Sequence, residues 1–152
     1  MVVERIYISP TQTAPQMACE RITLEAGKGV RGDRNFGQNA WPGQNLTLVE
    51  AEEIERFCLE NGRPLDLSLT RRNLVTRGLR LNELVNREFS IGGVRLRGVE
   101  LCEPCAKLGQ ALSDPSLTVA AVVRQWTGHG GLRVDVLSDG EICRGSRLTI
   151  DC

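Results

Sequence analysis

The residues best suited to chemistry lie in the segment Cys102-Glu103-Pro104-Cys105, which follows a strand-like run. A structural zinc site needs four ligands. The chain offers one such cysteine pair and one histidine, His129, so zinc or an iron–sulfur cluster would have to recruit scattered thiols. A redox Cys-x-x-Cys motif opens a helix inside a thioredoxin-like βαβ pattern, and no such pattern is expected here. Two interpretations stay open: one useful thiolate, or two core cysteines beside a proline turn.

Cys105 is the centre of any chemistry that this segment supports. A thiolate there would act as a nucleophile, bind a soft or cofactor-borne metal, or carry sulfur as a persulfide. Lys107 is close enough in sequence to stabilise negative charge on the sulfur if the geometry allows. The other cysteines are expected to be small hydrophobic residues in reduced form.

A second candidate is the pair Arg71-Arg72, followed by Asn73 at the start of a strand-like run. Guanidinium groups bind phosphate or carboxylate through two parallel hydrogen bonds, and an amide side chain can add another. Neighbouring residues of a strand point to opposite faces, so we expect at most one of the two arginines to face a pocket. The alternative is a pair of solvated charges.

Two glycine-rich segments complete the set of candidates. The segment from Gly27 to Asn35, which includes Gly32, Asp33 and Arg34, is expected to be a turn with charges of both signs, but its spacing fits neither a phosphate-binding P-loop nor a dinucleotide fingerprint. The segment from Gly128 to Arg133 contains His129 and Gly131, and its glycines would let a ligand approach the backbone. No Gly-x-Ser-x-Gly elbow accompanies His129, so a hydrolase triad has little support.

Composition limits the partners. Lys plus Arg and Asp plus Glu both number 19, and aromatic residues make up 4%. A neutral chain with few aromatic residues is not expected to bind nucleic acid or an anionic membrane. No run approaches the ~18 apolar residues of a membrane span, and the N-terminus does not resemble a signal peptide. We expect a cytoplasmic protein.

The elements that must position these residues are mainly strands, in one domain spanning residues 1–152. Strands are predicted at residues 2–9, 20–26, 45–49, 73–77, 87–91, 94–101, 132–137 and 147–150. Tight hairpins are predicted at 90–94 and 137–141. One helix is expected at about 50–61, and a second from the cap Asp114 to Gly128; neither is expected to carry chemistry. So many short strands favour a closed or partly closed β-barrel, or a sandwich.

Taken in order, five motifs resemble the MOSC domain, the molybdenum cofactor sulfurase C-terminal domain family. They are residues 32–35 (Gly-Asp-Arg-Asn), 44–50 (Gln-Asn-Leu-Thr-Leu-Val-Glu), 71–78 (Arg-Arg-Asn-Leu-Val-Thr-Arg-Gly), the Cys102–Cys105 segment and 130–133 (Gly-Gly-Leu-Arg). The match runs over roughly residues 20–150. It implies a mainly β fold with two or three helices, similar to the pyruvate kinase barrel.

The resemblance also implies a cofactor. The family cysteine that matches Cys105 ligates molybdenum or carries sulfur as a persulfide, and the arginine motif at Arg71-Arg72-Asn73 helps to hold the pterin phosphate. Candidate cofactor-binding residues are Arg71, Arg72, Asn73, Gly32, Asp33, Arg34, Lys107, Gly131 and Arg133. One thiolate then suffices, because the metal arrives on a phosphorylated molybdenum cofactor.

Three hypotheses about function within the family stay open. The chain is expected to be a molybdenum-cofactor-binding protein, a small molybdenum-dependent reductase of N-hydroxylated compounds, or a non-catalytic carrier of sulfur or cofactor. No pyridoxal phosphate site is expected, so a desulfurase-like donor or an electron-transfer protein is the expected partner. An enzyme of this kind would be a molybdenum-dependent oxidoreductase or a sulfur-transfer protein, and both stay open beside the non-catalytic carrier.

Overall fold

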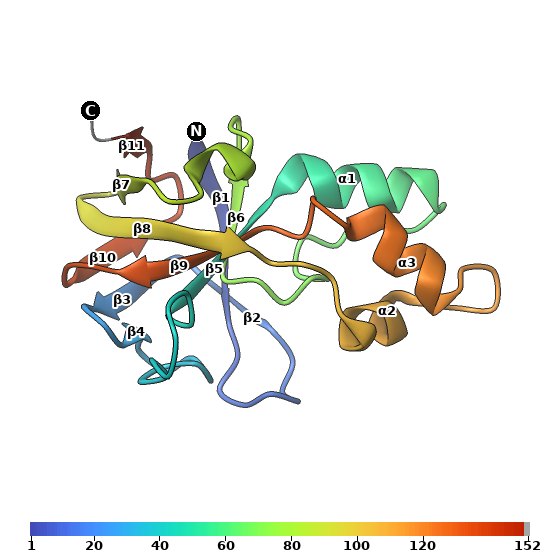
Figure 1. Ribbon diagram of the computed structural model, residues 1–152, viewed down its shortest axis with the longest axis horizontal. Coiled ribbons are helices and arrows are strands. Elements are labelled where there is room, and N and C mark those ends of the chain that lie inside the picture. Colours follow the sequence, from blue (N-terminus) through green and yellow to red (C-terminus); the bar gives the residue numbers. More distant parts are fainter. Residues whose placement is uncertain (151–152) are drawn as a thin grey trace.

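A computed structural model describes residues 1–150 of the chain. As predicted, the fold is mainly β, and three α-helices lie to one side of the strands (Figure 1). The two ends of the described chain, β1 and β11, lie near each other at the same side of the sheet. None of the helices within residues 1–150 is long and apolar enough to span a membrane.

Eight strands form the main sheet, in the order β11-β7-β8-β9-β5-β6-β1-β2. They are β1 (Val2–Ile8), β2 (Met17–Cys19), β5 (Leu46–Glu50), β6 (Leu74–Arg77), β7 (Glu88–Ile91), β8 (Val94–Leu101), β9 (Leu132–Val136) and β11 (Leu148–Ile150). β5 and β6 pair in parallel, and the other pairs are antiparallel. The sheet curls, and a bridge between Val2 of β1 and Arg147, the residue before β11, joins its two sides, so the predicted partly closed barrel is confirmed.

A smaller sheet of three strands covers part of the barrel. Its order is β10 (Gly140–Cys143), β3 (Arg21–Glu25) and β4 (Gly29–Val30). Alternation of apolar and polar residues explains which side faces inward: in β9, Leu132, Val134 and Val136 are buried while the residues between them are partly exposed. Apolar side chains of both sheets meet in one core inside the barrel.

The helices pack around a second apolar core outside the barrel. They are α1 (Ala51–Glu60), α2 (Ala106–Leu112) and α3 (Val119–Trp126). The short 3-10 turn η1 (Leu81–Leu84) instead packs its two leucines into the barrel core. The Trp126 ring lies 5.3 Å from the Phe57 ring, and both are fully buried. Because β8 and β9 are joined through α2 and α3, this second core fixes the helical pair that follows the cysteine segment.

Most predicted strands are confirmed, but three short ones were missed: β2, β4 and β10. The hairpin at residues 90–94 is confirmed, since Ile91 lies opposite Val94. The hairpin predicted at 137–141 is wrong. β9 and β10 belong to different sheets, so this turn carries the chain from one sheet to the other.

The helix predictions need two corrections. α1 is confirmed, but the second helix does not begin at Asp114. It begins at Val119, where the Thr118 hydroxyl accepts a hydrogen bond from the Ala121 N–H at 3.1 Å, and Asp114 instead closes a turn with Ser116. The helix α2 was missed altogether, and it follows Cys105 directly.

Candidate functional site

The candidate site is a cavity of about 540 Å³ between the barrel loops and α2. This volume falls in the range of small-molecule sites. Its lining residues come from several separate parts of the chain. They are Gln12 and Thr13; Arg34; Leu69, Thr70, Arg71 and Arg72; Glu103, Cys105, Lys107, Leu108 and Ala111; and Arg133 of β9. Segments far apart in the sequence therefore meet here.

Cys105 is exposed in this cavity, at the residue that precedes α2. The backbone N–H of Leu108 points toward its sulfur and lowers the pKa of the thiol, against the opposing effect of partial burial. The N–H of Lys107 and the positive charge of Arg72 lower that pKa further. None of these N–H groups reaches the geometry of a capping hydrogen bond. The thiol is therefore accessible, and its pKa lies below that of an ordinary cysteine.

Arg71 and Arg72 precede β6 and both line the cavity, so the prediction that only one faces a pocket is wrong. The physical reason is that Arg71 does not have strand geometry: its φ is 59°, in the left-handed region. Arg71 donates to the Ser9 hydroxyl at 3.2 Å and Arg72 to the Gly130 carbonyl at 3.1 Å. These are neutral acceptors, which leaves both positive charges uncompensated by an ion pair within the described chain.

Arg34 is the third arginine of the cavity and is largely buried, with 12% of its side chain exposed. Burial lowers its pKa, and the neighbouring charges of Arg71 and Arg72 add to this effect, while Asp33 opposes it. Asp33 itself accepts from the Ser9 N–H at 3.0 Å, which ties the turn to the loop after β1. Asp33 therefore positions Arg34, and neither it nor Gly32 is among the lining residues.

Asn73 is buried outside the cavity. Its Oδ1 accepts from the Thr47 N–H at 3.1 Å, and its Nδ2 donates to the Tyr7 carbonyl at 3.2 Å. These hydrogen bonds join β5 and β1 at the start of β6. Asn73 therefore fixes the place from which the two arginines project.

The glycine segment before β9 brings backbones into close contact. A Cβ on Gly130 would lie 2.1 Å from the Cys102 carbonyl oxygen, and one on Gly131 would lie 2.0 Å from that of Leu48. Only glycine fits such approaches. Gly130 thus lies against the segment after β8 and Gly131 against β5, at the start of β9, which pairs with both strands. Arg133, two residues later, reaches the cavity and pairs with Glu100 at 3.7 Å.

The charge of the cavity is strongly positive although the chain is neutral. Its described lining contains five cationic side chains, Arg34, Arg71, Arg72, Lys107 and Arg133, against one carboxylate, Glu103. Asp33 and Glu100 compensate two of the arginines. The arrangement is suited to an oxyanion beside a thiolate.

Cys102 differs from Cys105 in the exposure and in the pKa of its thiol. It is 1% exposed, and burial raises the pKa of its thiol. The Cys-x-x-Cys segment does precede a helix, contrary to expectation, but the strands that flank it, β8 and β9, are antiparallel. Within residues 1–150 there is no cluster of three metal-binding side chains. The described lining of the cavity contains one thiol, that of Cys105.

The remaining candidates lie elsewhere. His129 is outside the cavity, where its Nδ1 lies 3.0 Å from Glu53 of α1. Cys58 and Cys19 are at least partly buried, as expected of small hydrophobic residues, but Cys143 is exposed on β10. Cys152 lies outside the described residues.

Sequence reasoning missed several cavity residues. Leu108 and Ala111 form an apolar wall on α2, and their three-residue spacing was the available signal for that helix. Thr70, which precedes the arginine pair, is buried and also lines the cavity. Nothing in the residue types of Gln12 and Thr13 indicated that their loop would close the site.

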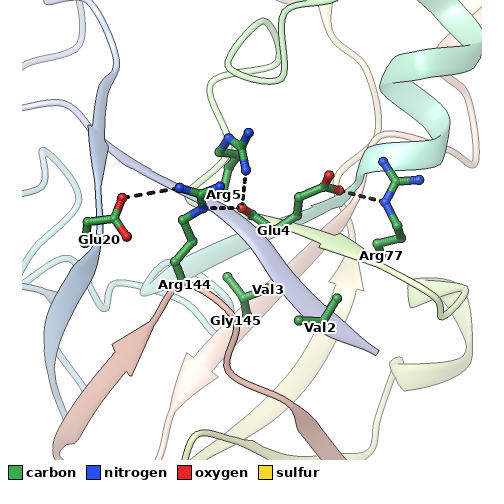
Figure 2. A pocket seen from close by; sticks show the side chains of 8 residues that line it. All are labelled: Val2, Val3, Glu4, Arg5, Glu20, Arg77, Arg144 and Gly145. Atoms are coloured by element: carbon green, nitrogen blue, oxygen red, sulfur yellow. Dashed lines mark hydrogen bonds and ion pairs between the residues drawn. The ribbon is translucent and has the colours of Figure 1, made fainter.

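A second hollow lies on another face of the barrel, beside β1 (Figure 2). It is a depression of about 480 Å³ with three arginines, Arg5, Arg77 and Arg144, among its lining residues. It contains no cysteine. Its arginines are engaged by carboxylates or by the Glu4 carbonyl oxygen.

Comparisons with known proteins agree with the fold. The family model described as the MOSC domain matches residues 32–149. The YUAD protein from Bacillus subtilis has a similar structure, with 21% sequence identity and a TM-score of 0.82 over 97% of this chain and 93% of that chain. YiiM from Geobacillus stearothermophilus is 15% identical, with a TM-score of 0.77 over 99% of this chain and 75% of that chain. A search of curated proteins found no match.

Proposed function

The chain belongs to the MOSC domain family, and from this premise we propose that its cavity binds molybdenum cofactor, with Cys105 as the molybdenum ligand or as a persulfide carrier. One observation carries the proposal. An accessible thiol with a lowered pKa lies in the same cavity as Arg71 and Arg72, whose charges have no ion-pair partner in residues 1–150.

The residues of the cavity fit such a group. A soft thiolate is a suitable ligand for a soft metal, and one ligand is enough if the metal arrives already held by its cofactor. The guanidinium groups of Arg71 and Arg72 would bind the phosphate, and Arg34 would add charge behind them. The tight contacts of Gly130 and Gly131 keep Arg133 and the cysteine segment at fixed places around the cavity. When bound, molybdenum cofactor supplies two-electron and oxygen-transfer chemistry.

Sulfur transfer needs only the thiol and a donor. In that step the Cys105 thiolate attacks the outer sulfur of a donor persulfide, a new S–S bond forms, and the donor leaves as a thiolate. The persulfide now on Cys105 is the product, and no net oxidation occurs. The expected partner is therefore a protein that carries a cysteine persulfide, such as a desulfurase.

The proposal is tested by protein purified from a host that makes molybdenum cofactor. We expect molybdenum and pterin to co-purify, or mass spectrometry to find added sulfur on Cys105. Cys105→Ser removes this retention, whereas Cys102→Ser has a milder effect. Cys143→Ser is the control for an exposed thiol outside the cavity. Equal tolerance of all three changes refutes the proposal.

Two further functions are candidates for the same cavity. The apolar wall of Leu108 and Ala111 leaves room beside the cationic side for an organic substrate, which favours a small reductase of N-hydroxylated compounds. Reduction of such a compound by the molybdenum-loaded protein with a surrogate electron donor supports that reading. A carrier without catalysis would hold sulfur on Cys105 and show no such turnover.

A further inference from the structure

The residue before the two arginines of the cavity has an unpaired buried hydroxyl. Thr70 is 3% exposed and lines the cavity, and its Oγ1 has no hydrogen-bond partner among residues 1–150. Buried hydroxyls are almost always paired, because an unpaired one costs free energy. The fold thus tolerates a cost at the wall of its main cavity.

A second unfavourable feature lies one residue away. Arg71 has a φ of 59°, a conformation that side chains other than glycine and asparagine rarely adopt. Such strain is found at ligand clamps, where the surrounding structure fixes it. Here it turns Arg71 toward the loop after β1, where its Nη2 donates to the Ser9 hydroxyl and to the Gln12 carbonyl. The strain and the unpaired hydroxyl occur together in one wall.

Two other buried polar atoms are unpaired in the described chain, Glu52 Oε1 and Trp126 Nε1. Neither residue lines the cavity. Glu52 uses its other oxygen to accept from the Gly78 N–H at 2.9 Å, and Trp126 lies in the helical core. Thr70 alone combines an unpaired hydroxyl with a place beside Arg71 and Arg72.

We propose that Thr70 is a further anion-binding residue, whose hydroxyl donates to an oxygen of the phosphate that Arg71 and Arg72 hold. The inference rests on the proposed function and adds a neutral donor to the charged ones. The ligand class is a phosphate monoester, for which inorganic phosphate serves as the probe. The hydroxyl is covered in the unliganded state, and we expect it to reach the anion by rotation to another staggered rotamer.

The test is Thr70→Val, which removes the hydroxyl and keeps the shape of the side chain. We expect two changes of opposite sign. Phosphate binding, measured by isothermal titration, weakens by about tenfold, since a hydrogen bond to a charged group is lost. The thermal midpoint without phosphate rises by about 2–4 °C, since the unpaired hydroxyl is gone. A purely structural role would lower the midpoint and leave binding unchanged.

Three variants serve as controls. Thr70→Ser keeps the hydroxyl and should retain phosphate binding, whereas Thr70→Ala removes it and should weaken binding as Thr70→Val does. Thr76→Val changes a threonine that is fully buried outside the cavity and donates to the Val49 carbonyl at 3.4 Å. This variant should lower the thermal midpoint and leave phosphate binding unchanged.

The outcomes separate this inference from the proposed function. If Arg72→Ala abolishes phosphate binding and neither Thr70→Val nor Thr70→Ala weakens it, the anion site stands and Thr70 has no part in it. If the unaltered protein binds no phosphate at all, both the site and the role of Thr70 are refuted.

Discussion

Four arginines line the candidate cavity and three line the depression beside β1, and the two groups differ in how many of their charges are paired with carboxylates. Of the cavity arginines (Arg34, Arg71, Arg72 and Arg133), two have carboxylate partners among the described residues: Arg34 with Asp33 at 3.5 Å and Arg133 with Glu100 at 3.7 Å. The other two donate to neutral oxygens. Their charges are therefore available to a ligand.

Among the surface arginines (Arg5, Arg77 and Arg144), two are paired with carboxylates, and Figure 2 shows Arg77 beside Glu4 and Arg144 beside Glu20. Arg77 bonds Glu4 at 2.8 Å and also pairs with Glu55, while Arg144 pairs with Glu20 at 3.3 Å. Arg5 and Arg144 both donate to the Glu4 carbonyl oxygen. This group ties β1 to β6 and to the turn after β10. Since the two hollows have similar volumes, the candidate site is distinguished by two adjacent arginines without a carboxylate partner, Arg71 and Arg72, that share the cavity with the Cys105 thiol, whereas only Arg5 lacks such a partner in the depression.

The largest expected effect is the loss of phosphate binding in Arg72→Ala. A charge-assisted hydrogen bond to phosphate is removed from a partly buried place, so affinity should fall by about tenfold or more. The measurement is isothermal titration with inorganic phosphate. Arg144→Ala is the matched control from the surface arginines and should bind phosphate as the unaltered protein does. A similar loss in both variants would erase the distinction between the two groups.

A smaller effect, on the free energy of unfolding and not on phosphate binding, is expected from Arg77→Ala. This change removes two ion pairs of a side chain that is 38% exposed, so the free energy of unfolding should fall by about 0.5–1 kcal/mol. Urea denaturation measures it, and high salt should reduce the difference between variant and unaltered protein. Phosphate binding should not change. A weakened affinity here would mean that the surface arginines also serve a ligand.

The sequence predicted the barrel because its signals are local. Alternating apolar residues and Gly-containing turns specify most strands, and the turn at Gly92-Gly93 specifies the hairpin of β7 and β8. The wrong hairpin at residues 137–141 contains the same kind of signal. Which strand pairs with β10 is decided by contacts with β3, more than a hundred residues earlier in the chain, and no local pattern reports it.

The sequence indicated many residues of the candidate cavity but not how they are arranged. Cys105, Arg71, Arg72, Arg34, Lys107 and Arg133 do line one cavity. The expectation that Arg71 and Arg72 face opposite ways failed because strand periodicity does not apply to a residue with a φ of 59°. The helix α2 was missed because it is the shortest α-helix of the described chain, with seven residues and a glycine at position 109 that packs against Val119.

The pH dependence of Cys105 reactivity sharpens the comparison further. Because the folded-state pKa of this thiol is lowered, the rate of its alkylation by iodoacetamide should rise through a midpoint below that of an ordinary cysteine, about pH 8.5. Arg72→Ala removes a positive charge, so the midpoint should move upward. It should not reach the ordinary value, since the N–H of Leu108, the largest cause, remains. Arg144→Ala should leave the alkylation midpoint unchanged. A shift in that variant would contradict the distinction between the cavity arginines and the surface arginines.

The smallest effect is expected from Lys107, whose proximity to Cys105 in sequence suggested a charge that stabilises the thiolate. In the structure the contribution of this residue to the lowered pKa comes from its backbone N–H, which any residue except proline supplies. Lys107→Ala should therefore keep the alkylation midpoint of the unaltered protein, and Lys107→Arg should match it. If Lys107→Ala raises the midpoint as far as Arg72→Ala does, its ammonium acts on the sulfur directly. The lysine would then join the cavity arginines as a source of unmet charge.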